Sequence, residues 1–192
     1  MNHVSKAELR RAVARLTATA ILASSGVLAG CTVIPDPWRD AGRIAWFHIG
    51  SSYGESRACL DSAVQGDAGT DEEIATRVQT CFDTSVFGET ASQRIEGAKL
   101  TGNRTWLLDS SPTATGLRVD AASVGYGKVV VAGVTTDVVL MACWTADLGP
   151  DRVWVVEERA CETYVLTLVE GAAQTVSLTI VERHIGDSKP GA

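Results

Sequence analysis

The chemistry that this sequence indicates most clearly is modification of a cysteine near its N-terminus. Cys31 follows residues 16–30, a stretch without charged side chains that is rich in Ala, Leu, Thr and Ser. Three arginines precede the stretch, Arg10, Arg11 and Arg15. A basic region followed by an apolar region is the order of an export signal. The apolar region is shorter than the roughly 20 residues of a membrane-spanning helix, so residues 1–30 are predicted to be a signal peptide.

The end of this signal indicates how the chain is anchored. Leu28, Ala29, Gly30 and Cys31 resemble the lipobox of bacterial lipoproteins, in which Leu, a small residue and Gly or Ala precede an invariable Cys. The resemblance covers only the first 31 residues. It implies that Cys31 is lipidated, becomes the mature N-terminus and attaches the protein to the extracytoplasmic side of the cell membrane, with the lipid bilayer as its partner. An ordinary secretory signal with a chance cysteine is the competing interpretation, and the export route, Sec or twin-arginine, stays open.

The composition describes one soluble domain with an acidic surface. Of the 192 residues, 45% are hydrophobic and 21% are charged, which argues against both a disordered chain and a polytopic membrane protein. The formal charge is -6, and without residues 1–30 the chain has 13 basic and 22 acidic residues, a net charge of -9. An acidic surface repels phosphate backbones, so we expect no nucleic-acid partner.

The other four cysteines, Cys59, Cys81, Cys143 and Cys161, predict two disulfides. They form an even set once Cys31 is assigned to lipid, and an exported chain lies outside the reach of cytosolic reductants. Three pairings are possible. We prefer Cys59 with Cys81 and Cys143 with Cys161, because each pair lies within one local supersecondary unit. Zinc bound by four thiolates is the competing interpretation, but the Cys-x-x-Cys spacing is missing, so we expect no metal.

The mature chain divides into a tether over residues 31–37, one domain over residues 38–185 and a flexible tail over residues 186–192. Two prolines mark the tether, and Asp36 with Pro37 fits the N-cap and first position of a helix. Such a helix would end at Gly50, although a strand over residues 44–49 fits the pattern nearly as well.

Two capping-box patterns predict a helical hairpin after Gly50. Ser52 with Glu55 and Thr70 with Glu73 each place a hydroxyl three residues before a carboxylate, at the start of helically spaced apolar residues. We expect one helix to end at Gly66 and a turn over residues 67–69 to lead into the second. Each helix carries a cysteine on its apolar face, so a disulfide would join them.

The sequence changes to a strand-like period near residue 94. Candidate strands cover residues 95–100, 104–108, 117–121, 128–132, 136–144, 152–157, 164–169 and 175–182. The last shows the clearest alternation, and residues 138–141 are apolar throughout, as in a central strand. Helices followed by meandering strands predict an α+β fold, with the helical hairpin packed on an antiparallel sheet or a small sandwich.

One motif raises the possibility of catalysis. Residues 50–54 (GSSYG) match G-x-S-x-G, the nucleophile elbow of α/β-hydrolases, and a triad would combine Ser52, His184 and an acid such as Asp137 or Asp151. The predicted strands lack the intervening helices of a parallel sheet. We therefore expect no catalytic residues and no cofactor, and predict a domain that binds an unknown protein or small molecule, with a serine hydrolase as the alternative.

Overall fold

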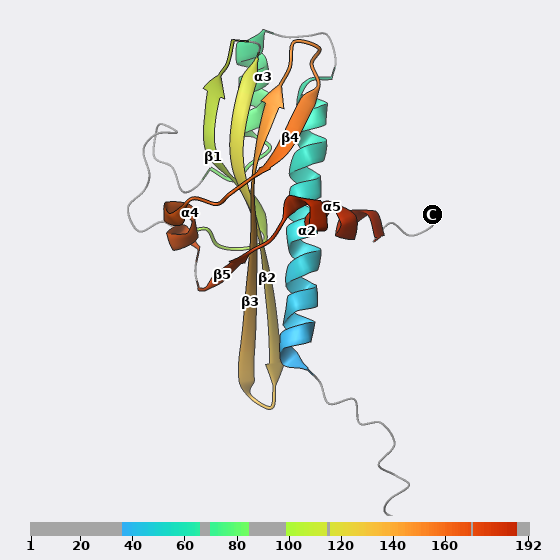
Figure 1. The fold of residues 1–192 in the computed structure, drawn as a ribbon, viewed down its shortest axis with the longest axis vertical. Coiled ribbons are helices and arrows are strands. Elements are labelled where there is room, and N and C mark those ends of the chain that lie inside the picture. Colours follow the sequence, from blue (N-terminus) through green and yellow to red (C-terminus); the bar gives the residue numbers. More distant parts are fainter. Residues whose placement is uncertain (1–35, 66–69, 85–98, 115, 170, 188–192) are drawn as a thin grey trace, which may run out of the picture. The chain divides into compact units, whose positions relative to one another are not determined.

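The computed structural model describes residues 36–65, 70–84, 99–114, 116–169 and 171–187 (Figure 1). These residues belong to one compact unit that begins at Asp36. The signal peptide, Cys31, most of the predicted tether, the turn over residues 67–69, most of the predicted strand at 95–100 and the end of the tail lie outside the described residues.

The domain has an α+β fold, as the sequence predicted. The described strands are β1 (Arg104–Pro112), β2 (Leu117–Val131), β3 (Val134–Leu148), β4 (Trp154–Arg159) and β5 (Ala173–Thr175). They form one sheet in the order β1-β2-β3-β4, antiparallel throughout, while β5 pairs parallel with β3. The helices are α2 (Pro37–Ala63), α3 (Asp71–Gln79), α4 (Thr163–Leu168) and α5 (Leu178–Asp187). Helix α2 lies alongside β2 and β3 (Figure 1).

Helix α2 begins where the sequence placed it but runs much further. The Asp36 carboxylate accepts hydrogen bonds from the backbone NH groups of Trp38 and Arg39, and Pro37 occupies the first turn. The strand alternative over residues 44–49 is wrong, and so is the end at Gly50, because α2 is one helix of 27 residues, Pro37–Ala63. A buried stripe that includes Ala41, Ala45, Ile49, Tyr53, Ser56 and Leu60 continues through this point. Its burial offsets the roughly 1 kcal/mol that a helical glycine costs.

Two glycines of β2 let α2 approach the sheet closely. A Cβ atom at Gly127 would lie 1.8 Å from the Ala41 carbonyl oxygen, and one at Gly125 would lie 2.3 Å from that of Ala45. Only residues without side chains fit so near a helix backbone. The sequence predicted two strands, over residues 117–121 and 128–132, separated here. Instead β2 is one 15-residue strand, and the glycines are its contact with the helix.

Helix α3 confirms the second capping box. The Thr70 hydroxyl accepts from the Glu73 backbone NH at 3.3 Å, and the Glu73 carboxylate accepts from the Thr70 backbone NH at 2.9 Å. The predicted pair of helices is therefore present, although its first member is the far end of α2 rather than a separate helix.

The C-terminal strand predictions are wrong. Residues 163–168 form α4, with Val165 buried, and residues 178–187 form α5, leaving only β5 as a short strand. The apolar residues at 176, 178 and 180 alternate as in a strand. In the same segment, Leu178 and Val181 are three residues apart, which is a helical spacing. Both of these are buried, whereas Ile180 is 42% exposed. The helical period is the one that matches the core.

Candidate functional site

The serine of the G-x-S-x-G motif lies inside a helix. Residues 50–54 belong to α2, not to the turn between a strand and a helix that a nucleophile elbow requires. The Ser52 hydroxyl is buried and donates to the His48 carbonyl oxygen at 2.9 Å. Ser52 and Glu55 do not form a capping box either, since Glu55 accepts a hydrogen bond from Ser51 at 2.8 Å. Ser52 is therefore a helix-interior residue.

The other predicted triad members make separate contacts. His184 lies on α5, and its ring centroid is 4.9 Å from that of Trp46. Asp137 pairs in register with Lys128 in the β2–β3 hairpin, and Asp151 accepts from the Val153 backbone NH in the β3–β4 turn. The hydrogen bonds and ion pairs found among the described residues do not join any of these side chains to Ser52.

A buried chain of polar groups lies beneath Ser52 instead. The Thr105 hydroxyl is 2.9 Å from the Ser52 carbonyl oxygen and 2.9 Å from the Ser123 hydroxyl. The Ser123 hydroxyl accepts from the Trp144 indole at 3.0 Å. Buried polar groups require such partners. The chain connects α2 through β1 and β2 to β3 and has a structural role.

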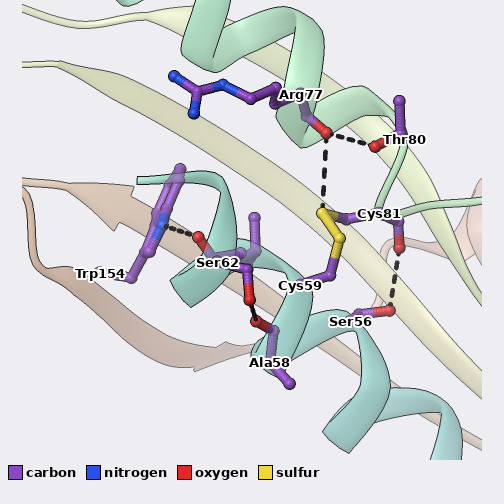
Figure 2. The surroundings of a disulfide bond; sticks show 9 residues. Ser56, Ala58, Cys59, Ser62, Arg77, Thr80, Cys81 and Trp154 are labelled. Carbon is purple, nitrogen blue, oxygen red and sulfur yellow. Dashed lines mark hydrogen bonds between the residues drawn. A yellow bond between two sulfur atoms is a disulfide. The ribbon is translucent and has the colours of Figure 1, made fainter. Parts of the chain in front are cut away.

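The Cys59–Cys81 disulfide connects the end of α2 to the segment after α3 (Figure 2). The Ser56 hydroxyl donates to the Cys81 carbonyl oxygen at 3.3 Å. The Cys81 sulfur lies 3.8 Å from the Arg77 carbonyl oxygen, a contact without a proton because the sulfur is in a disulfide. The pairing is the one preferred from the sequence.

The second disulfide joins Cys143 to Cys161, again as preferred. Cys143 is a buried residue of β3, and Cys161 follows β4 just before α4. The two Cα–Cα distances, 5.5 and 5.2 Å, lie in the usual range. Zinc is excluded at these four sulfurs because all are paired. Elsewhere in the described part of the chain, His, Cys, Asp and Glu form no cluster that could hold a metal ion.

A depression of about 470 Å³ between α2 and α5 is a candidate binding site among the described residues. The Tyr53 hydroxyl donates to the Glu182 carboxylate at 2.7 Å. Burial raises the pKa of the Tyr53 phenol well above its usual value, and the bond to Glu182 adds to the effect. Arg57 lies 3.5 Å from Asp61 and donates to the Trp154 carbonyl oxygen at 3.2 Å. Its other terminal nitrogen, Nη1, is buried and has no hydrogen-bond acceptor among the described residues.

No pattern in the sequence predicted this depression. Residues 175–182 were predicted to form a strand, in which Glu182 and Ile185 would not lie one helical turn apart. Only α5 places Glu182 and Ile185 one turn apart beside Tyr53 and Gly54. A helical reading of residues 178–185 was the signal that could have found it.

A second groove, of about 640 Å³, lies next to the Cys59–Cys81 disulfide. Its lining includes five residues with hydroxyl groups, together with Asn103 and the ion pair of Asp83 with Arg104. Residues 85–98, which follow Thr84, lie outside the described residues.

None of the described helices is long and apolar enough to cross a membrane. The chain matches no family model, no curated protein and no solved structure.

Proposed function

We propose that this protein is an extracytoplasmic lipoprotein, anchored in the cell membrane by acyl chains on Cys31 and carrying a non-enzymatic binding domain. The observation that carries the proposal is the sequence Leu28, Ala29, Gly30, Cys31 after a basic and an apolar region. Two or more acyl chains on one residue give stable membrane attachment, whereas one gives only marginal binding.

The two disulfides support export. Both join residues of the same domain, and Cys143 is 3% exposed. Structural disulfides persist in oxidising compartments and are rare in the cytosol. With all four cysteines of the domain paired, Cys31 is the one thiol left for modification.

Binding is supported by the depression between α2 and α5. The depression is lined by the Arg57 guanidinium and the carboxylates of Asp61 and Glu182, beside the apolar side chains of Val156 and Ile185. A protein or small-molecule partner with neutral hydrogen-bonding groups beside an apolar surface would suit this lining. The proposed role is therefore to present this surface at the outer face of the membrane.

The test of the anchor compares two single substitutions in the lipobox of the full chain. Cys31→Ala removes the sulfur that would carry the lipid. Ala29→Ser keeps a small residue at its position and serves as the matched control. Cells are grown with a clickable fatty acid, and the labelled fraction and the membrane pellet are measured for each variant. We expect label and membrane retention for the unmodified chain and for Ala29→Ser, and the loss of both for Cys31→Ala.

Retention of label and membrane attachment by Cys31→Ala would overturn the proposal. So would an unlabelled, fully soluble unmodified chain.

A further inference from the structure

One end of the domain combines the start of α2 with the tip of the β2–β3 hairpin. This hairpin end comprises residues 36–43 and 128–137. Gly127 of β2 lies directly against Ala41 of α2, so these two residues are at the same height along the domain. Figure 1 shows the hairpin extending past the start of α2. The five strand residues from Gly127 to Ala132 advance about 3.3 Å each, whereas the five helical residues from Ala41 back to Asp36 advance only about 1.5 Å each. The tip therefore projects beyond the first turn of α2.

The tip of the hairpin is apolar and exposed. Its two-residue turn is Ala132-Gly133, both with positive φ, as in a type I′ turn. Val130 and Val134 beside it are 60% and 67% exposed, and Trp38 at the start of α2 is 65% exposed. Such turns in water usually carry Asn or Asp. Apolar side chains gathered at an exposed end mark a contact with another apolar surface.

The charge of this end also differs from that of the chain as a whole. Residues 129–136 contain no charged side chain. The charged residues of the hairpin end are three acidic and three basic: Asp36, Asp40, Asp137, Arg39, Arg43 and Lys128. After residue 30 the chain as a whole has a net charge of -9. The hairpin end thus lacks the negative charge that would keep an acidic protein away from anionic lipid headgroups.

The lipobox cysteine is close in sequence to this end. Four uncharged residues, Thr32, Val33, Ile34 and Pro35, separate Cys31 from the N-cap Asp36. A fully extended chain of this length reaches at most about 17 Å. An acyl anchor on Cys31 would therefore hold the start of α2 within this distance of the bilayer.

We propose that the hairpin end docks on the bilayer that holds the Cys31 anchor, with Val130, Val134 and Trp38 at the level of the lipid headgroups. This orientation rests on the proposed lipoprotein anchor. Tryptophan is enriched at membrane interfaces, where an apolar ring with one polar group is favoured. Docking would direct the opposite end of the domain, which carries the Cys59–Cys81 disulfide, away from the membrane.

The test uses the full chain, purified from membranes and reconstituted in vesicles of phosphatidylcholine brominated near the top of its acyl chains. Bromine quenches tryptophan only at close range, so an exposed Trp38 at the interface would lose fluorescence while buried Trp144 would not. We expect quenching relative to unbrominated vesicles and the loss of most of it in Trp38→Phe. Acylation of Cys31 is measured by mass spectrometry on the same samples.

Two pairs of substitutions separate docking from folding. Val130→Asp with Val134→Asp places charge at the hairpin end and should abolish most of the quenching. Val153→Asp with Val155→Asp is the matched control, because these valines are 54% and 55% exposed near the β3–β4 turn and should leave quenching unchanged. Equal quenching in both pairs would overturn the docking.

The outcomes distinguish this inference from the anchor on which it rests. An acylated chain without quenching overturns the docking alone, and a dimer of that chain in detergent would assign the hairpin end to a second copy. A chain that is not acylated but is quenched overturns the anchor alone. A chain with neither overturns both.

Discussion

Different contacts stabilise the two ends of the domain. At one end, the Cys59–Cys81 disulfide links α2 to the segment after α3, and Arg152 in the β3–β4 turn pairs with Asp71 at 3.1 Å. We call this the disulfide end. Next to the hairpin end, the backbone of β2 packs directly against the backbone of α2 at Gly127. Beyond this contact, Val130 and Val134 are exposed.

The difference shows which end is built to face water. The disulfide end carries three acidic residues in the first turn of α3, where the helix dipole favours them. Two exposed valines, Val153 and Val155, lie at this end as well, but they accompany the acidic first turn of α3 and the ion pair of Arg152 with Asp71. The hairpin end leaves large apolar side chains without cover among the described residues. A domain with an acidic end and an end whose tip carries no charge has a preferred orientation at a surface, which the docking proposal assigns to the membrane.

Removing the Cys59–Cys81 disulfide is expected to change the free energy of unfolding more than the other substitutions. Replacing both Cys59 and Cys81 by Ala opens a loop defined by a sequence separation of 22. Loss of the constraint on the unfolded chain should lower the free energy of unfolding by about 3 kcal/mol. Urea denaturation measures the loss, and amide hydrogen exchange should show faster opening in α3 but not in the β2–β3 hairpin. Equal acceleration in both would mean that the two ends are not held independently.

The next effect is expected at the hairpin end. Gly127→Ala forces a methyl group onto the Ala41 carbonyl, so α2 must shift and the free energy of unfolding should fall by roughly 2 kcal/mol. Gly42→Ala is the matched control. Nothing lies within 4 Å of its added methyl group, and alanine is the better helix former, so a gain of about 0.5–1 kcal/mol is expected. Urea denaturation of both variants checks the pair, and equal effects would refute close packing at Gly127.

The smallest effect concerns the contact between α2 and α5, midway between the ends. Because the folded-state pKa of Tyr53 is raised, its stabilising contribution is complete below the unfolded value of about 10 and is lost as pH rises above it. Tyr53→Phe should lower the free energy of unfolding by about 1 kcal/mol at pH 7. It should also flatten the decline of stability above pH 10. Parallel pH profiles for the two proteins would show that Tyr53 is not buried against Glu182.

Local signals in the sequence were sufficient to predict the structure where a few neighbouring residues determine it. Asp36 and Pro37 fix the start of α2, Thr70 and Glu73 fix that of α3, and cysteine positions indicated the pairing. Each is a short-range effect that depends on a few neighbouring backbone groups.

The sequence failed where a tertiary contact reverses the local preference. Gly125 and Gly127 looked like an interruption between strands, yet they mark the closest approach of α2. Ser52 and Glu55 fit a capping box, yet the buried stripe of α2 continues through them. Residues 178–181 satisfy both a strand and a helix pattern, and packing against α2 selects the helix. The depression lined by Tyr53 and Glu182 depends on that choice.

The central claim is that residue 31 is the anchor, and the mass of the N-terminal peptide tests it most directly. The protein is isolated from the membrane fraction, digested, and its first peptide is sequenced by mass spectrometry. We predict a peptide that begins at Cys31 and carries a diacylglycerol group on its sulfur. A peptide that begins at any other residue, or a Cys31 with an unmodified thiol, would contradict the account.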